Sequence, residues 1–261
     1  MKSRRLLVLD LNGTILHRLT HAFETKLFRN HPIVISEKLK PDITIHGCKI
    51  VFRPHAITFL THILKHFDVA VWTSSRPQNA LPMVHHSFKN MLDFSSILEE
   101  AKQRNVSVRQ VILGPSDKGA ELMKEKLLKD TQGKTKLKFI WTQSECDTVA
   151  VDKKKDQQSA NDDSSKPSFT KPLRKKDLDK IYSTFPACTP LNTIIIDDTD
   201  AKLIDHLENH LCLPEFNVTD HSIDFTADKI LLQVKKYLDR LLKEDPEDVR
   251  TFLAKYDLED C

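Results

Sequence analysis

The sequence predicts an α/β protein with a Rossmann-like, mostly parallel central sheet, flanked by helices and carrying a small β-hairpin insertion. Short, continuous apolar runs occur at residues 6–9, 69–72 and 193–196, and each is followed at once by polar residues. Such runs are typical of strands that are covered on both faces, as in parallel sheets. Segments with helical character lie between the runs. Strands that alternate with helices favour a parallel sheet.

The elements between these strands follow from local patterns. Residues 43–52, with Gly47 inside, predict a β-hairpin. Arg53-Pro54 opens a helix to about Phe67, because its apolar residues recur at helical spacing and proline suits a first helical turn. Residues 137–141 are a further strand candidate. Additional helices are expected after Pro77 and at 96–104, 117–129, 200–208, 227–243 and 246–256, and an ordered segment is expected at 177–185.

One domain is expected to span residues 1–243, with a flexible, low-complexity insertion at about 147–175. This insertion is rich in Lys, Asp, Ser and Gln, and Phe169 is its only aromatic residue. A segment of this composition buries too little apolar surface to order itself. Residues 244–261 are expected to form a C-terminal helical tail. The total of 261 residues suits one large domain or two small ones.

Composition narrows the class of protein. The chain has 40 basic and 37 acidic residues, a balance that gives no indication of direct nucleic-acid or membrane binding. It has no long apolar run for a membrane span, and the N-terminal apolar run is too short for a signal peptide. Five scattered cysteines without a C-x-x-C pair fit a reducing compartment. We therefore expect a nuclear or cytoplasmic protein.

The chemistry is expected at the strand ends. The three apolar runs end in Asp10-x-Asn12-Gly13-Thr14, Thr73-Ser74-Ser75 and Asp197-Asp198. Ligands of open α/β sheets bind beyond the carboxyl ends of the strands. Each residue alone could be an ordinary cap or turn residue. Together, acidic residues from two strands would make an oxygen-rich pocket that suits Mg²⁺ and its phosphate ligands.

With a metal present, Asp10 could perform covalent chemistry. A carboxylate can attack phosphorus and form an aspartyl phosphate, which water later hydrolyses. The Thr73 hydroxyl would donate to a phosphate oxygen, and a lysine would supply positive charge to the transferring group. Gly13 would let the backbone turn closely around the phosphate.

These residues give the sequence a resemblance to the haloacid dehalogenase superfamily. Within it, the chain resembles the C-terminal-domain phosphatase family, also called NLI-interacting-factor-like. The resemblance covers residues from about 5 to 243. The motifs that carry it occur in the family's order along the chain and are Leu7-Val8-Leu9-Asp10-Leu11-Asn12-Gly13-Thr14-Ile15-Leu16, Arg53-Pro54 with Phe59-Leu60, Val71-Trp72-Thr73-Ser74-Ser75, Lys176-Asp177-Leu178 and Asn192-Thr193-Ile194-Ile195-Ile196-Asp197-Asp198.

The resemblance implies a Mg²⁺-dependent, phosphoaspartyl-type protein serine/threonine phosphatase. The resemblance also implies that Asp10 is the nucleophile, that Asp198 is a metal ligand, and that Lys176 is the phosphate-binding lysine, with Lys171 as the alternative. The candidate residues are, for catalysis, Asp10, Asn12, Thr73 and Lys176; for phosphate or substrate binding, Gly13, Thr14, Thr73, Ser74, Arg76 and Lys176; and for the metal, Asp10, Asn12, Asp197 and Asp198. The implied partner is a phosphoprotein or phosphopeptide, such as the RNA polymerase II tail, and the chain is expected to be a monomer.

One residue departs from the family pattern. The family normally has an aspartate two residues after the nucleophile, as general acid, and this chain has Asn12. An amide cannot protonate a leaving serine alkoxide, and a positioned acid is typically worth about 10²–10⁴-fold in rate. A backbone carbonyl at this position could still bind the metal. Two hypotheses therefore stay open: a weak phosphatase, and a catalytically silent phosphopeptide-binding or adaptor module. The phosphatase is favoured because the other site positions persist.

Overall fold

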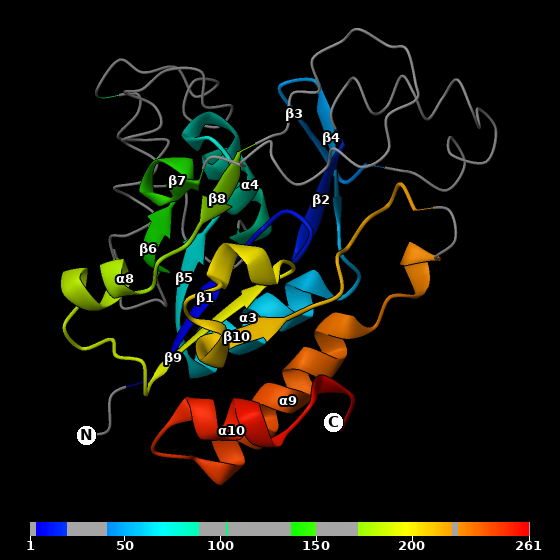
Figure 1. Ribbon diagram of the computed structural model, residues 1–261. Helices are drawn as coiled ribbons and strands as arrows, with labels where there is room; N and C mark the ends of the chain where they lie inside the picture. Colours follow the sequence, from blue (N-terminus) through cyan, green and yellow to red (C-terminus); the bar gives the residue numbers. More distant parts are fainter. Residues whose placement is uncertain are drawn as a thin grey trace, which may run out of the picture.

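The computed structural model describes residues 4–19, 41–88, 103, 137–149, 172–220 and 224–260. Within them, the central sheet has five parallel strands in the order β10-β9-β1-β5-β6 (Figure 1). These strands are β1 (Leu6–Leu9), β5 (Asp68–Trp72), β6 (Leu137–Trp141), β9 (Thr193–Asp197) and β10 (His210–Cys212). The three apolar runs thus form adjacent parallel strands with β1 between β9 and β5, which confirms the predicted fold class.

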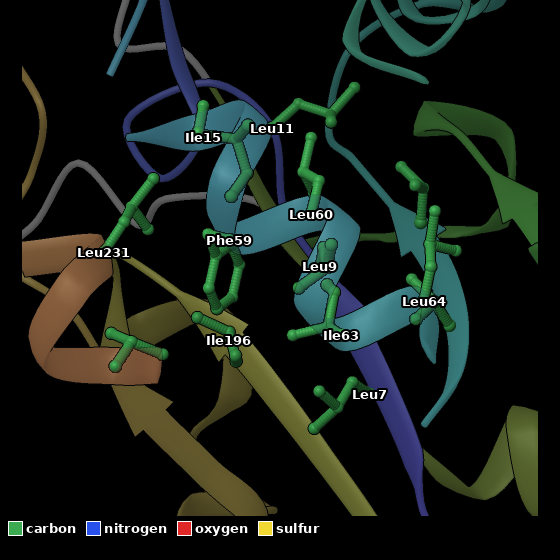
Figure 2. Packing of buried hydrophobic residues seen from close by; sticks show 14 of the residues in the cluster. Leu7, Leu9, Leu11, Ile15, Phe59, Leu60, Ile63, Leu64, Ile196 and Leu231 are labelled. Atoms are coloured by element: carbon green, nitrogen blue, oxygen red, sulfur yellow. The ribbon is translucent and has the colours of Figure 1, made fainter. Parts of the chain in front are cut away.

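Both faces of the sheet are buried, which explains why its strands have continuous apolar sequences. Leu7 and Leu9 of β1 point to the face covered by α3 (Ala56–His66) and α9 (Ile230–Glu244). Figure 2 shows Phe59 and Ile63 of α3 packed near Leu9 and Ile196. Burial of a large aliphatic or aromatic side chain contributes roughly 1.5–3 kcal/mol, so this face supplies much of the stability of the site's scaffold.

The opposite face of the sheet has its own cluster. Leu6 and Val8 of β1 pack there with Trp72 of β5 and with Ile181 of α8 (Asp179–Thr184). Successive residues of a strand point to opposite faces, so the alternation within Leu6–Leu9 divides this strand between two cores. The result is a three-layer arrangement in which the strand ends are held from both sides.

A small antiparallel sheet follows β1 in the chain. It consists of β2 (Leu16–Leu19), β4 (Cys48–Phe52) and β3 (Ile43–Ile45), in the order β2-β4-β3. The predicted hairpin is β3–β4. Its two-residue loop, His46-Gly47, has positive φ angles of 48° and 74°, as expected for the tight turn that joins twisted strands. The third strand, β2, was not predicted.

The structure also adds to or departs from the sequence predictions in the later part of the chain. The expected helix at 200–208 is wrong: two short 3₁₀ helices occur there, η2 (Asp200–Leu203) and η3 (Leu207–Asn209). The ends of the expected flexible insertion form a strand pair, β7 (Asp147–Val149) with β8 (Leu173–Lys175), and the rest of that insertion lies outside the described residues. The helix α10 (Val249–Lys255), which lies in the expected C-terminal helical tail, buries side chains in the main core.

The remaining elements of the described residues are one helix that packs in the main core and three short 3₁₀ helices. They are α4 (Pro77–Phe88), η1 (Gln143–Glu145), η4 (Phe225–Ala227) and η5 (Leu258–Asp260). The expected helix at 117–129 lies outside the described residues, as does the one at 96–104 except for residue 103. No helix in the described part of the chain combines the length and the hydropathy needed to cross a bilayer.

Candidate functional site

The parallel register of β1 and β9 brings three carboxylates together. Leu9 pairs with Ile196, and the Asp10 backbone N–H donates to the Ile196 carbonyl at 2.9 Å. Asp10 and Asp197 are almost completely buried. Carboxylate oxygens of Asp10, Asp197 and Asp198 all lie within 4.8 Å of one another. The two strand ends therefore meet in the way that the sequence predicted.

Lys202, which the sequence analysis did not select, lies at the centre of these carboxylates. Its Nζ is 3.0 Å from Asp10 Oδ2, 2.8 Å from Asp197 Oδ1 and 3.0 Å from Asp198 Oδ1. Burial disfavours its charge, but the surrounding carboxylates outweigh burial and raise the pKa of Lys202 above its ordinary value. The ammonium group therefore contacts one oxygen of each carboxylate while fully charged.

A second lysine, Lys176, lies on the other side of the carboxylate cluster. Its side chain is completely buried, with Nζ 2.5 Å from Asp197 Oδ2 and 3.4 Å from Asp10 Oδ1. Its backbone N–H donates to the Lys202 carbonyl at 2.7 Å, so one main-chain bond places both lysines. Lys171, the alternative phosphate lysine, lies outside the described residues.

Gly13 makes room for one of the carboxylates. It has a φ of +88°, and a Cβ at this position would lie 2.4 Å from Asp198 Oδ2. Glycine is therefore needed both for the backbone conformation and for the close approach of Asp198. The neighbouring Thr14 is fully buried, and its hydroxyl has no hydrogen-bond partner among the described residues. Neither Gly13 nor Thr14 lines the cavity above the cluster, and their predicted roles in phosphate binding stay predictions.

Asn12 has a structural role at the start of the small sheet. Its Oδ1 accepts a hydrogen bond from the Arg18 backbone N–H at 2.8 Å, which closes the loop between β1 and β2. Asn12 also lines the cavity, beside Asp10. Asn12 occupies the sequence position at which the resemblance implies a general acid, and its amide cannot donate a proton to an alkoxide.

The cavity above the carboxylates measures about 590 Å³ and reaches Asp10, Asp198 and Lys202. Thr73 and Ser74, at the end of β5, line its floor. Thr73 Oγ1 accepts from the Ser75 backbone N–H at 3.3 Å, while the buried Ser74 Oγ has no partner in the described part of the chain. Both hydroxyl groups can donate to an oxyanion that enters this space.

Three arginines are among the residues that line the cavity, and we call them its cationic rim. They come from Arg18 of β2, Arg76 before α4 and Arg174 of β8. A neighbouring hollow of about 350 Å³ shares four lining residues with the cavity: Arg76, Gln78, Gln143 and Arg174. Sequence analysis suggested only Arg76 for substrate contact, because arginines that are far apart in the chain give no local signal. The two hollows together offer more room than a lone phosphate needs, beside the cationic rim.

The donor set of the cluster fits a hard divalent cation. Mg²⁺ prefers carboxylate and carbonyl oxygens and commonly binds through few carboxylates together with phosphate oxygens. Asp10 and Asp198 offer such oxygens at the cavity floor, with Asp197 beneath them. Lys202 Nζ now contacts these same three groups, so its side chain and a metal would compete for their oxygens.

Comparison with known proteins gives one family match. Residues 5–111 match the family model of NLI interacting factor-like phosphatases. An uncharacterized FCP1 homology domain-containing protein of Schizosaccharomyces pombe is 24% identical over 239 residues, which is 92% of this chain and 72% of that protein.

Two solved structures also match, and this chain spans about half the length of each. The structure of Fcp1, an essential RNA polymerase II CTD phosphatase, is 14% identical with a TM-score of 0.38, over 94% of this chain and 51% of the other. A variant of the fission yeast RNA polymerase II CTD phosphatase Fcp1 bound to beryllium fluoride is 14% identical with a TM-score of 0.37, over 97% of this chain and 54% of the other. These scores are too low to bear on the fold, which rests on the chain's own sheet topology.

Proposed function

We propose that this chain, whose residues 5–111 match the NLI interacting factor-like phosphatases as its sequence predicted, is a phosphoaspartyl-type phosphatase for phosphoserine or phosphothreonine in proteins. The observation that carries the proposal is the position of Asp10. This carboxylate follows the central strand, lies beside Asp197 and Asp198, and lines a cavity with a cationic rim. A nucleophilic carboxylate with nearby cations and hydroxyl donors is the arrangement that covalent phosphoryl transfer requires.

The reaction would proceed in two steps at Asp10. In the first, an Asp10 oxygen bonds to phosphorus while the bond between phosphorus and the substrate oxygen breaks, and the leaving alkoxide takes up a proton. In the second, water attacks the aspartyl phosphate, which releases inorganic phosphate and restores the carboxylate. The hydroxyl groups of Thr73 and Ser74, which line the same cavity, would donate to the phosphoryl oxygens in both steps.

Mg²⁺ is the proposed cofactor. Asp10, Asp198 and the Asn12 carbonyl would hold it, with Asp197 beside them, and the close grouping of the three carboxylates supports this assignment. When bound, the metal would polarise the phosphoryl group and offset its charge. Lys176, which is ion-paired with Asp10 and Asp197, would hold the nucleophile in position.

Asn12 is expected to make the enzyme selective for good leaving groups. Without a general acid, the alkoxide that leaves an alkyl phosphate such as phosphoserine must take its proton from water or from a substitute donor. An aryl phosphate needs little protonation, so its hydrolysis tests the nucleophile alone. We therefore propose a slow enzyme on phosphopeptides and a faster one on aryl phosphates.

The substrate is proposed to be a phosphorylated peptide segment. The cationic rim formed by Arg18, Arg76 and Arg174 suits a phosphorylated or acidic chain, because guanidinium groups bind phosphate and carboxylate in bidentate fashion. The RNA polymerase II tail stays a candidate through the resemblance to its phosphatases. A nuclear or cytoplasmic location, a monomeric state and the absence of direct nucleic-acid and membrane contacts also stay proposals.

A second candidate function is a phosphopeptide-binding or adaptor module without turnover. Asn12 in place of the acid favours it, as does the Lys202 ammonium at the centre of the carboxylates. Hydrolysis of an aryl phosphate in the presence of MgCl₂ distinguishes the two candidates. The phosphatase proposal expects release of the aryl alcohol by the wild type and its loss in Asp10→Asn. Phosphopeptide binding without hydrolysis of either substrate would instead support the silent module.

A further inference from the structure

We propose that Lys202 is a built-in cation at the metal position of this site, so that Mg²⁺ binds only after the Lys202 ammonium withdraws. This inference concerns the site of the proposed function and rests on its assignment of a metal there. It adds a residue that sets the affinity for the metal. Lys202 would hold the carboxylates together in the metal-free protein and would compete with the divalent ion for them.

The geometry of the ammonium carries the inference. Lys202 Nζ contacts one carboxylate oxygen of each of Asp10, Asp197 and Asp198, at 2.8–3.0 Å. These three residues are the ones whose oxygens could also hold a metal. Mg²⁺ binds oxygen at about 2.0–2.1 Å and needs the same lone pairs. An ammonium group and a metal ion therefore cannot share this position.

The backbone of Lys202 is fixed while its side chain can leave. Its N–H donates to the Thr199 carbonyl at 3.2 Å, and its carbonyl accepts from the Lys176 N–H at 2.7 Å. The side chain enters the cluster from the cavity, where it forms part of the lining and keeps 16% of its surface exposed. Rotation of its four-carbon stem into the cavity would vacate the position without moving the chain.

Electrostatics require a cation at this point. Lys176 is ion-paired with Asp197 and Asp10 and not with Asp198, so it cannot balance all three carboxylates. Like charges at such distances repel one another. The site is therefore built for one more cation, and the chain supplies a single positive charge where Mg²⁺ would supply two.

The test is calorimetric titration of MgCl₂ into the wild type, Lys202→Met and Lys235→Met. Methionine keeps most of the length of the side chain and removes its charge. Lys235 is a suitable control because it is ion-paired with Asp239 on α9, away from the site. We expect Lys202→Met to bind Mg²⁺ at least about 10-fold more tightly than the wild type, a change equivalent to about 1.4 kcal/mol. Lys235→Met should bind like the wild type.

Equal or weaker Mg²⁺ binding by Lys202→Met would overturn the inference, and so would an absence of binding in all three proteins. None of these outcomes depends on turnover, so the phosphatase proposal would still be decided separately by aryl phosphate hydrolysis. A wild type that binds no Mg²⁺, together with a Lys202→Met variant that does, would support the inference.

A second measurement is used if the variant Lys202→Met folds only in the presence of the metal. If Lys202→Met is unfolded without Mg²⁺, circular dichroism is recorded against MgCl₂ and against NaCl of matched ionic strength. Refolding by MgCl₂ alone supports competition for one position. Failure to refold with MgCl₂, or equal refolding with NaCl, contradicts it. Lys202→Arg, which keeps the charge, should fold without metal and bind Mg²⁺ no more tightly than the wild type.

Discussion

Gly13 and Asp198 approach so closely that no side chain fits between them: a Cβ on Gly13 would lie 2.4 Å from Asp198 Oδ2. The carboxylate could turn away only by disturbing its contact with Lys202, because its other oxygen, Oδ1, bonds to Lys202 Nζ at 3.0 Å. The loop after β1 is therefore fitted directly to the carboxylate that follows β9. This contact couples the backbone of one strand end to the ion cluster of its neighbour.

Substitution of Gly13 tests this contact, and Gly47 offers a matched control. Both glycines have positive φ, but a Cβ on Gly47 would have no atom within 4 Å. Gly47→Ala should therefore lose only the roughly 1–2 kcal/mol of a left-handed backbone. Gly13→Ala should lose more stability in urea unfolding and should also bind Mg²⁺ more weakly, because Asp198 must move. Equal losses of stability in the two variants would mean that Asp198 accommodates the methyl group freely.

Lys176 should be a major contributor to stability. It is fully buried and pairs with two buried carboxylates, and removal of one partner of such a group typically costs about 3–5 kcal/mol. Lys176→Met should show a loss of this size in the free energy of unfolding. Lys180→Met is the control, because Lys180 pairs with exposed Asp147 and exposed pairs contribute less than about 1 kcal/mol. Similar losses in both variants would contradict the assigned role of Lys176.

His17 should make the protein less stable in mild acid. Burial lowers its pKa below the ordinary value of 6.5, and its Nδ1 donates to the Phe216 carbonyl at 3.0 Å. The unfolded chain therefore binds more protons at this residue, so its contribution is complete above about pH 6.5 and is lost as pH falls toward the lowered pKa. In urea unfolding at a series of pH values, His17→Gln should show a shallower decline below pH 6.5. A decline as steep as that of the wild type would exclude His17 as a cause.

Arg76 should strengthen the binding of phosphopeptides and should contribute little to the binding of small substrates. It is exposed and lines both the cavity and the neighbouring hollow. Arg76→Ala should raise KM for a phosphopeptide by roughly the 10-fold that one charge-assisted contact provides, with little change in kcat. Its KM for an aryl phosphate should change much less. Steady-state kinetics of both substrates check this, and an equal effect on both would place Arg76 at the phosphate itself.

The sequence predicted four of the five strands of the central sheet, because these strands are buried on both faces, and it missed the three-residue edge strand β10. The runs at 6–9 and 137–141 coincide with β1 and β6. The strand β2 was missed because Leu16-His17-Arg18-Leu19 has only two apolar residues and gains its partners from the later strand β4. A four-residue strand whose hydrogen-bonding partner is distant in the sequence has little local pattern from which to predict it.

The error at 200–208 has a local cause. The Lys202 carbonyl, which an α-helix would offer to the His206 N–H, accepts from Lys176 instead, and the His206 N–H bonds to Leu203. The same arrangement explains why Lys202 was missed as a site residue. A lysine in a predicted helix is usually a solvated surface residue, and only the fold shows that it turns inward. Asp10, Thr73 and Asp198 were accessible to prediction because each follows a recognisable strand.

The most direct test of the proposed function compares two substrates in four proteins. An aryl phosphate and a phosphoserine peptide are assayed with MgCl₂ in the wild type, Asn12→Asp, Asp10→Asn and the surface control Lys235→Met. We predict that the wild type cleaves the aryl phosphate faster than the peptide. Asn12→Asp should accelerate peptide cleavage by about 10²-fold or more, and aryl phosphate cleavage less, because it restores the missing proton donor. Asp10→Asn should abolish both reactions, and Lys235→Met should match the wild type. Absence of cleavage of both substrates in the wild type and in Asn12→Asp, or activity that survives Asp10→Asn, would contradict the account.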